Sequence, residues 1–144
     1  MGVISEIPKL FNEIIQAAGK IDILVNCAGT TFRQPAVEFP VEEWNRVLAV
    51  NLTAPFVLSQ QFAQACIAEK RSGRIINITS LLSEAARPTI PAYTASKGAI
   101  KQLTQALAVE WAPYHINVNA IGPGYFATEM TQPLVENSEF TNWV

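Results

Sequence analysis

The sequence predicts an α/β domain in which a parallel β-sheet is covered by helices, and two observations support this fold class. Segments with the 3.6-residue apolar period of a helix alternate with short apolar runs typical of strands, three of each kind. No linker or internal repeat interrupts this alternation, so residues 1–144 are interpreted as a single domain. Helices that alternate with strands form right-handed crossovers, which predicts parallel strands and helices on both faces of the sheet.

The first helix is predicted to begin after Ser5, which is interpreted as its N-cap, and to end at about residue 18, and the first strand is predicted at 21–25. The apolar residues 7, 10, 11, 14, 15 and 18 follow the helical period, and Gly19 suits the position after a helix C-terminus. The run Ile-Asp-Ile-Leu-Val at 21–25 is interpreted as a strand buried on both faces. It leads into the turn-forming stretch 26–29.

A long helix is predicted from about residue 41 to residue 70, followed by a buried strand at 74–79. Pro55 lies in the middle of this helix, where it lacks a backbone donor and clashes with the carbonyl of Asn51. We therefore expect a kink at this point.

The last helix is predicted at about 92–112 and the last strand at 116–121. Pro113 ends the helix, and Gly122-Pro123-Gly124 follows the strand. All three strands therefore end in small or polar residues. Because ligands of parallel sheets bind at the carboxyl ends of the strands, this clustering predicts a binding site there.

Composition narrows the function classes. Charged residues make up 15% of the chain, below the roughly 25% of an ordinary soluble domain, which suggests that much of the surface is covered. Ten basic residues face twelve acidic ones and never cluster, so nucleic-acid binding is not expected. No apolar run reaches the roughly 18 residues of a membrane span, and no secretory signal is visible, so a cytoplasmic protein without membrane contact is predicted.

The two cysteines give no sign of a metal site or a disulfide. Cys27 and Cys66 lie far apart, with no partner residues at a metal-ligand spacing. Both are therefore interpreted as small, buried apolar residues.

Tyr93 and Lys97 carry the clearest chemical signal. They are four residues apart on the predicted helix 92–112, so their side chains share one face. An ammonium beside a phenol favours the phenolate and brings tyrosine toward useful acid–base chemistry at neutral pH. Ser80 ends a predicted strand thirteen residues earlier, and its hydroxyl suits holding a carbonyl oxygen beside the phenol.

Taken together, these residues resemble the short-chain dehydrogenase/reductase family over essentially the whole chain. Within that family the sequence is most similar to sugar-acid members, the gluconate 5-dehydrogenase and 2-deoxy-gluconate dehydrogenase group. This finer similarity rests on residues 28–31 with Arg33, on residues 91–97, and on residues 129–131. The family motifs are Asn26-Cys27-Ala28-Gly29 after a strand, Val50-Asn51-Leu52, Ser80, Tyr93-Thr94-Ala95-Ser96-Lys97 and Pro123-Gly124.

The resemblance implies a doubly wound, Rossmann-like sheet and an oxidoreductase that uses NAD or NADP to interconvert a secondary alcohol and a ketone. Tyr93 would protonate the carbonyl oxygen, and Lys97 would lower the pKa of Tyr93 and bind the nicotinamide ribose. Ser80 would orient the small-molecule substrate, and Asn51 would hold a water molecule in a proton relay. Arg33 is interpreted as a solvated loop charge, with contact to a substrate carboxylate as the alternative.

Further residues are implied in cofactor binding and in assembly. The family pattern places Asn26, Ala28 and Gly29 behind the adenosine ribose, where Gly29 would permit close backbone approach. It places Pro123, Gly124 and Thr128 around the nicotinamide and the diphosphate. It also implies a homo-oligomer through the helices near 41–70 and 92–112, and it implies no metal.

Two family features are missing from the sequence. The glycine-rich turn that presents backbone N–H groups to the cofactor diphosphate has no counterpart, since Gly2 and Gly19 are the only glycines before Gly29. The first and last family strands are missing as well, so the domain is interpreted as incomplete. Because the first family strand pairs beside 21–25, its loss would leave 21–25 as an exposed edge strand. The alternative function is therefore a truncated, non-catalytic remnant or an interaction protein of the same fold.

Overall fold

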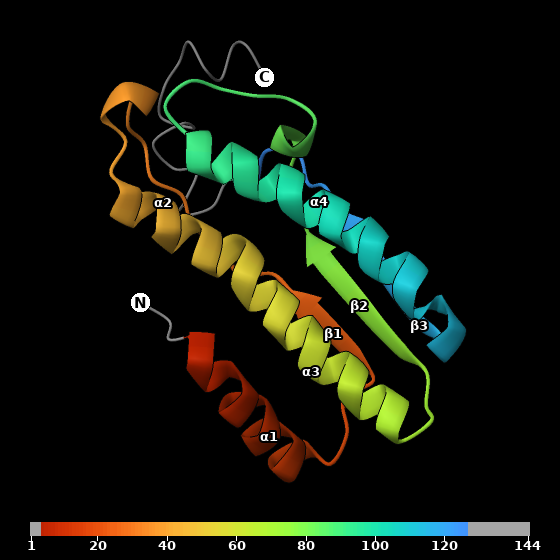
Figure 1. The fold of residues 1–144 in the computed structure, drawn as a ribbon. Helices are drawn as coiled ribbons and strands as arrows, with labels where there is room; N and C mark the ends of the chain where they lie inside the picture. The colour runs from red at the N-terminus through yellow and green to blue at the C-terminus, as the bar shows by residue number, and fades with distance from the viewer. Residues whose placement is uncertain (1–3, 127–144) are drawn as a thin grey trace.

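The computed structural model describes residues 4–126. These residues form a parallel sheet with the strand order β1-β2-β3, so that β2 lies in the centre (Figure 1). The strands are β1 (Ile23–Asn26), β2 (Gly73–Ile78) and β3 (Ile116–Ile121). The helices are α1 (Ile7–Ala18), α2 (Val41–Leu48), α3 (Ala54–Ala68) and α4 (Pro91–Trp111). The predicted α/β fold class is confirmed.

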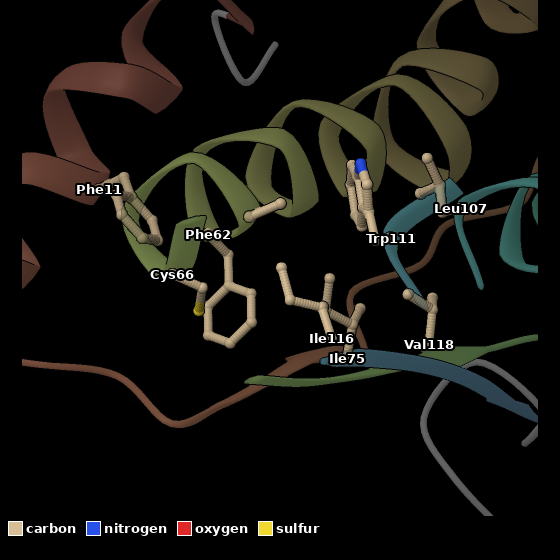
Figure 2. Close-up of a cluster of buried hydrophobic side chains, with 9 residues drawn as sticks. Phe11, Phe62, Cys66, Ile75, Leu107, Trp111, Ile116 and Val118 are labelled. Carbon is tan, nitrogen blue, oxygen red and sulfur yellow. The ribbon is translucent and has the colours of Figure 1, made fainter. Parts of the chain in front are cut away.

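Helices α3 and α4 lie against one face of the sheet, and α1 packs beside α3 (Figure 1). The hydrophobic core fills the space between them and the strands, where Phe62 and Ile75 are completely buried (Figure 2). Burying an aromatic or aliphatic side chain of this size stabilises the fold by roughly 1.5–3 kcal/mol. The cluster consists of Phe11, Phe62, Ala63, Cys66, Ile75, Leu107, Trp111, Ile116 and Val118.

The opposite face of the sheet carries exposed apolar side chains within residues 4–126. Ile23 and Val25 of β1 are 57% and 51% exposed, whereas Leu24 between them packs against the core. The expectation that this strand is buried on both faces is therefore wrong for the described residues, because their helices cover one face only. Among residues 4–126, β1 pairs with β2 alone and lies at the edge of the sheet, as the sequence predicted.

The predicted long helix is interrupted where expected. A π-helical turn, Ala49–Thr53, joins α2 to α3 and contains the buried Asn51. Pro55 lies in the first turn of α3, where a missing backbone N–H costs little. The helix ends at Ala68, two residues before the predicted boundary.

Gly73 makes the close contact between α3 and β2 possible. A Cβ atom at this position would lie 2.6 Å from Cε1 of Phe62 and 2.9 Å from Sγ of Cys66. No residue with a side chain fits there without displacing the core. The first residue of β2 can therefore pass directly beneath the last turns of α3.

The two cysteines differ in their surroundings. Cys66 is buried as predicted, and this burial raises the pKa of its thiol. Cys27 is exposed, so the prediction that it is buried was wrong: the turn after β1 faces a cavity rather than the core. Both thiols are free.

In the part of the chain that the structure describes, no helix combines the length and the apolar character needed to cross a membrane.

Candidate active site

The turns that follow all three strands meet at one cavity of about 600 Å³. Gly29 follows β1, Ser80 follows β2, and Gly124 follows β3, so each strand contributes to the lining at its carboxyl end. Tyr93 and Lys97 line the same cavity from α4. The structure thus brings together six of the predicted site residues: Gly29, Ser80, Tyr93, Lys97, Pro123 and Gly124.

Lys97 is held at the base of the cavity. Its side chain is buried, and its Nζ atom donates a 2.6 Å hydrogen bond to the carbonyl of Ile78 at the end of β2. The same Nζ lies 5.6 Å from the ring centre of Tyr93. Burial lowers the pKa of Lys97, and an electrostatic interaction with Cys27 opposes this effect. The lysine is therefore a poorly solvated cation beside the phenol ring.

Ser80 is oriented by its own backbone turn. It has an extended conformation at the end of β2, and its Oγ atom accepts a 3.2 Å hydrogen bond from the backbone N–H of Leu82. The following residues form a short 3₁₀ turn, Leu81–Ser83. Among the described residues, the Ser80 hydroxyl donates to no protein acceptor, which leaves its hydrogen available to a ligand in the cavity.

Asn51 lies behind the cavity and organises the loop after β1. Its Nδ2 atom donates to the carbonyl of Thr30 at 2.9 Å and to Oγ of Ser96 at 3.0 Å. Its Oδ1 atom accepts from the backbone N–H of Thr30 at 2.8 Å. Ser96 in turn donates to the carbonyl of Tyr93 at 2.7 Å. The amide of Asn51 therefore links the loop after β1 to the helix that carries Tyr93.

Asn26 points into the fold rather than into the cavity. Its Nδ2 atom donates to Oγ of Ser59 at 3.1 Å and to Oδ1 of Asn77 at 2.8 Å. Asn77 donates to Oγ1 of Thr104 at 2.9 Å, so these buried polar side chains connect two strands to α3 and α4. The side chain of Asn26 acts as a structural link, and any contact with a cofactor would come from its neighbours.

The other predicted cofactor-binding residues are distributed differently. Ala28 lines a second groove, between α1 and the α2–α3 helices, and not the cavity. A Cβ atom on Gly29 would lie 3.8 Å from Oδ1 of Asn51 and 3.9 Å from Nζ of Lys97. These are ordinary contacts, so the protein itself does not demand glycine there. Thr128 lies outside the described residues.

Sequence reasoning missed several residues of the cavity wall. Arg87 lies over the ring of Tyr125 at 5.4 Å, and both line the cavity together with Phe126. Arg33 was not missed, since the sequence indicates a solvated loop charge there with a substrate contact as the alternative, and in the structure it is exposed and lines the cavity. Among the described lining residues, Arg33, Arg87 and Lys97 are cationic and none is a carboxylate. This excess of positive charge in the cavity lining depends on the positions of the loops, so the sequence did not reveal it.

Within residues 4–126, no group of three or more histidine, cysteine or acidic side chains could hold a metal ion.

Comparisons with known proteins show the family that the chain resembles. The family model of the short chain dehydrogenases matches residues 3–139. The chain is 50% identical over 139 residues to 5-keto-D-gluconate 5-reductase of Escherichia coli, which covers 96% of this chain and 54% of that protein. It is 46% identical over 126 residues to gluconate 5-dehydrogenase of Gluconobacter oxydans, covering 88% of this chain and 49% of that one. The chain spans about half the length of the curated relatives it matches.

A solved structure of a relative has the same fold. It is a gluconate 5-dehydrogenase from Burkholderia cenocepacia in complex with NADP and tartrate. The TM-score is 0.93 at 40% sequence identity, and the match covers 98% of this chain and 55% of that one.

Proposed function

The chain belongs to the short chain dehydrogenase family, and on that premise we propose that it supplies the acid–base site of an NAD(P)-dependent enzyme that interconverts a secondary alcohol and a ketone. The observation that carries this proposal is the meeting of Tyr93, Lys97 and Ser80 at one cavity. Tyr93 and Lys97 come from α4, and Ser80 comes from the end of β2.

The residues present suit a nicotinamide cofactor. Gly29 and Gly124 present backbone without a side chain to the cavity, and a Cβ on Gly29 would project beside Lys97. We assign Gly29, Lys97, Pro123 and Gly124 to the cofactor. When bound, NAD(P) supplies the hydride in reduction and accepts it in oxidation.

Tyr93 moves the proton in this mechanism. In reduction its hydroxyl gives a proton to the carbonyl oxygen as the carbonyl carbon gains a hydride, which completes the alcohol; oxidation reverses both transfers. Ser80 donates its free hydroxyl hydrogen to the same oxygen and stabilises the charge that develops there. Lys97 places a positive charge 5.6 Å from the centre of the phenol ring.

Asn51 would contribute through its backbone. Both donors of its amide and its acceptor are already used by Thr30 and Ser96. A water molecule in a proton relay to Lys97 would therefore bind the carbonyl of Asn51, which belongs to the π-helical turn.

The charges of the cavity favour an anionic substrate, and we assign a sugar acid. Arg33 and Arg87 can pair with a carboxylate, and the described lining offers no acidic side chain to repel it. The relatives named for gluconate, and the tartrate bound to the Burkholderia cenocepacia protein, are consistent with this class.

Cofactor titration and one substitution test the function. Nicotinamide fluorescence should report saturable binding of NADH or NADPH by the purified protein, and Tyr93→Phe should bind equally while losing about 10²–10⁴-fold in kcat. Tyr114→Phe, on an exposed tyrosine, is the matched control and should keep full activity. The non-catalytic alternative predicts no binding of either nucleotide at millimolar concentration.

We also propose a homo-oligomer that packs through α3 and α4. The sequence of α3 contains no charged residue, and apolar side chains on the outer surface of the two helices include Phe56, Ile67 and Val109, the last 79% exposed. Sedimentation at micromolar concentration tests this, with Val109→Glu expected to shift the protein toward the monomer. The cytoplasmic location stays a prediction.

A further inference from the structure

A serine hydroxyl group links the 3₁₀ turn after Ser80 to α4. Oγ of Ser83 accepts a 3.3 Å hydrogen bond from the backbone N–H of Ser80. The same hydroxyl donates a 2.8 Å hydrogen bond to the carbonyl of Lys97, in the middle of the turn of α4 that follows Tyr93. One side chain therefore bridges the backbone of the strand-end serine and the backbone of the helix that carries the lysine.

The direction of these hydrogen bonds is fixed by the chemistry of the groups. A backbone carbonyl can only accept, so the one hydrogen of Ser83 must point at Lys97. The backbone N–H of Ser80 can only donate, so it points at Ser83. The chain of donors thus runs from Ser80 through Ser83 to Lys97 with no alternative arrangement.

This arrangement also determines what the side chain of Ser80 can do. Its Oγ atom receives the N–H of Leu82, which occupies one of its two acceptor positions and orients the hydroxyl. The Ser80 and Ser83 side chains thus form a reciprocal cap at the start of the turn. As a result the free hydrogen of Ser80 is kept for the cavity.

We propose that Ser83 is a positioning residue for the reaction: it holds Ser80 as a hydrogen-bond donor at a fixed distance from Tyr93. This inference rests on the proposed function. Ser83 affects the reaction only if Ser80 and Tyr93 bind the same substrate oxygen, as the proposed mechanism requires. Ser83 itself is absent from the cavity lining and touches the chemistry only through Ser80 and Lys97.

A second link between the same elements gives a matched control. Glu84 follows the turn and forms an ion pair with Lys101 of α4, with side chains that are 67% and 38% exposed. An exposed pair of this kind contributes little to stability. It connects the turn to the helix without contacting Ser80, so Glu84→Gln loosens the attachment but leaves the hydrogen bonds of Ser83 in place.

Steady-state kinetics on Ser83→Ala, Ser83→Thr and Glu84→Gln test the proposal. Ser83→Ala should lower kcat about tenfold or more, since small displacements of positioned groups have effects of that size or larger. KM for the nicotinamide cofactor should stay within about twofold, because the residues assigned to the cofactor are unchanged. Ser83→Thr keeps a hydroxyl and should restore kcat, and Glu84→Gln should leave it unchanged.

Hydrogen exchange gives a readout that needs no turnover. The amides of Ser80 and Leu82 should exchange faster in Ser83→Ala than in the wild type and in Glu84→Gln, because the bridge that holds them is lost. A wild-type protein without turnover would refute the proposed function, while the exchange rates would still decide the role of Ser83.

Three results would overturn the inference: wild-type kcat in Ser83→Ala, equal losses of kcat in the alanine and threonine variants, or unchanged exchange of Ser80 in Ser83→Ala.

Discussion

The helix–sheet layer has an apolar end and a polar end, built from the same elements. Where the strands begin, α3 and α4 contribute Phe62, Cys66 and Trp111 to a dry core. Where the strands end, the same helices contribute Ser59 and Thr104 to buried hydrogen bonds with asparagines. Because these helices run opposite to the strands, each of them spans both ends (Figure 1). The apolar core and the polar residues near the strand ends therefore lie at opposite ends of the same helices and strands.

Removing the centre of the apolar end should have the largest effect on stability. Phe62 is completely buried, so Phe62→Ala loses its transfer free energy and leaves a cavity. The free energy of unfolding, measured by urea denaturation, should fall by about 3–5 kcal/mol. Leu10→Ala, on a side chain that is 50% exposed, should cost under about 1 kcal/mol. Equal losses in both variants would contradict the distinction between core and surface.

Adding one methyl group to the apolar end should have the next largest effect. Gly73→Ala places a Cβ 2.6 Å from the ring of Phe62, and the overpacking should cost about 1–3 kcal/mol. Gly98→Ala is the matched control, since its Cβ would meet no atom within 4 Å inside α4. That variant should be stabilised by about 0.5–1 kcal/mol, because alanine has the better helix propensity. An unchanged stability of Gly73→Ala would contradict this prediction and show that the surrounding core side chains can shift to accommodate the Cβ.

The polar end should be less costly to disturb. Asn77→Ala removes the partner of Asn26 and the donor to Thr104, and leaving buried polar groups without partners should cost about 1–2 kcal/mol. Asn119→Ala changes an exposed residue on β3 and should have almost no effect on thermal unfolding. A loss for Asn77→Ala as large as that for Phe62→Ala would make the polar end an equal contributor to stability.

Lys97→Met should have the smallest effect on stability, and it should stabilise the protein, whereas Phe62→Ala, Gly73→Ala and Asn77→Ala should destabilise it. Burial lowers the pKa of Lys97 from its ordinary value of 10.5, so the unfolded chain binds more protons than the folded one between the lowered pKa and 10.5. The free energy of unfolding of the wild type should therefore rise with pH across that window. Below the window, the buried charge of Lys97 lowers the free energy of unfolding by a constant amount. Lys97→Met should unfold at a higher temperature at neutral pH, lack this rise, and lose catalytic activity.

Lys101→Met, on an exposed lysine of the same helix, is the control and should keep the wild-type pH dependence. A Lys97→Met variant with the wild-type slope would show that Lys97 is not the group responsible.

Local patterns in the sequence predicted most of the elements, because they depend on contacts close along the chain. The β-branched run 116–121 gave boundaries that match β3, and the apolar period gave the end of α1 at Ala18. The prediction that Ser5 caps α1 was wrong, because Ser5 lies in a 3₁₀ turn, Ile4–Glu6, that precedes the helix. The interruption near Asn51 followed from the chemistry of Pro55. Tyr93 and Lys97 lie on one helix, so their common exposure to a cavity needed only the helical repeat.

Contacts that depend on the path of a loop could not be predicted from local sequence patterns. Arg87 and Tyr125 meet across about forty residues of sequence, and nothing near either residue indicates the other. Cys27 was expected to be buried because of its residue type, although its position at the end of a strand lies in the predicted binding site, and it is exposed. The bridge formed by Ser83 requires a 3₁₀ turn packed against α4, which a serine three residues after Ser80 does not reveal by itself.

The π-helical turn sets the rotational phase of everything that follows it. Val47, Asn51, Pro55 and Ser59 are all buried at steps of four residues, whereas four residues of α-helix overshoot a full turn by about 40°. The wider turn at Ala49–Thr53 takes up part of that overshoot, so these four residues stay on one side of the helical segment. Deleting one residue from this turn would rotate α3 and carry Phe62 away from the sheet. The π-helical turn therefore acts as a one-residue insertion that cannot be removed without rotating α3.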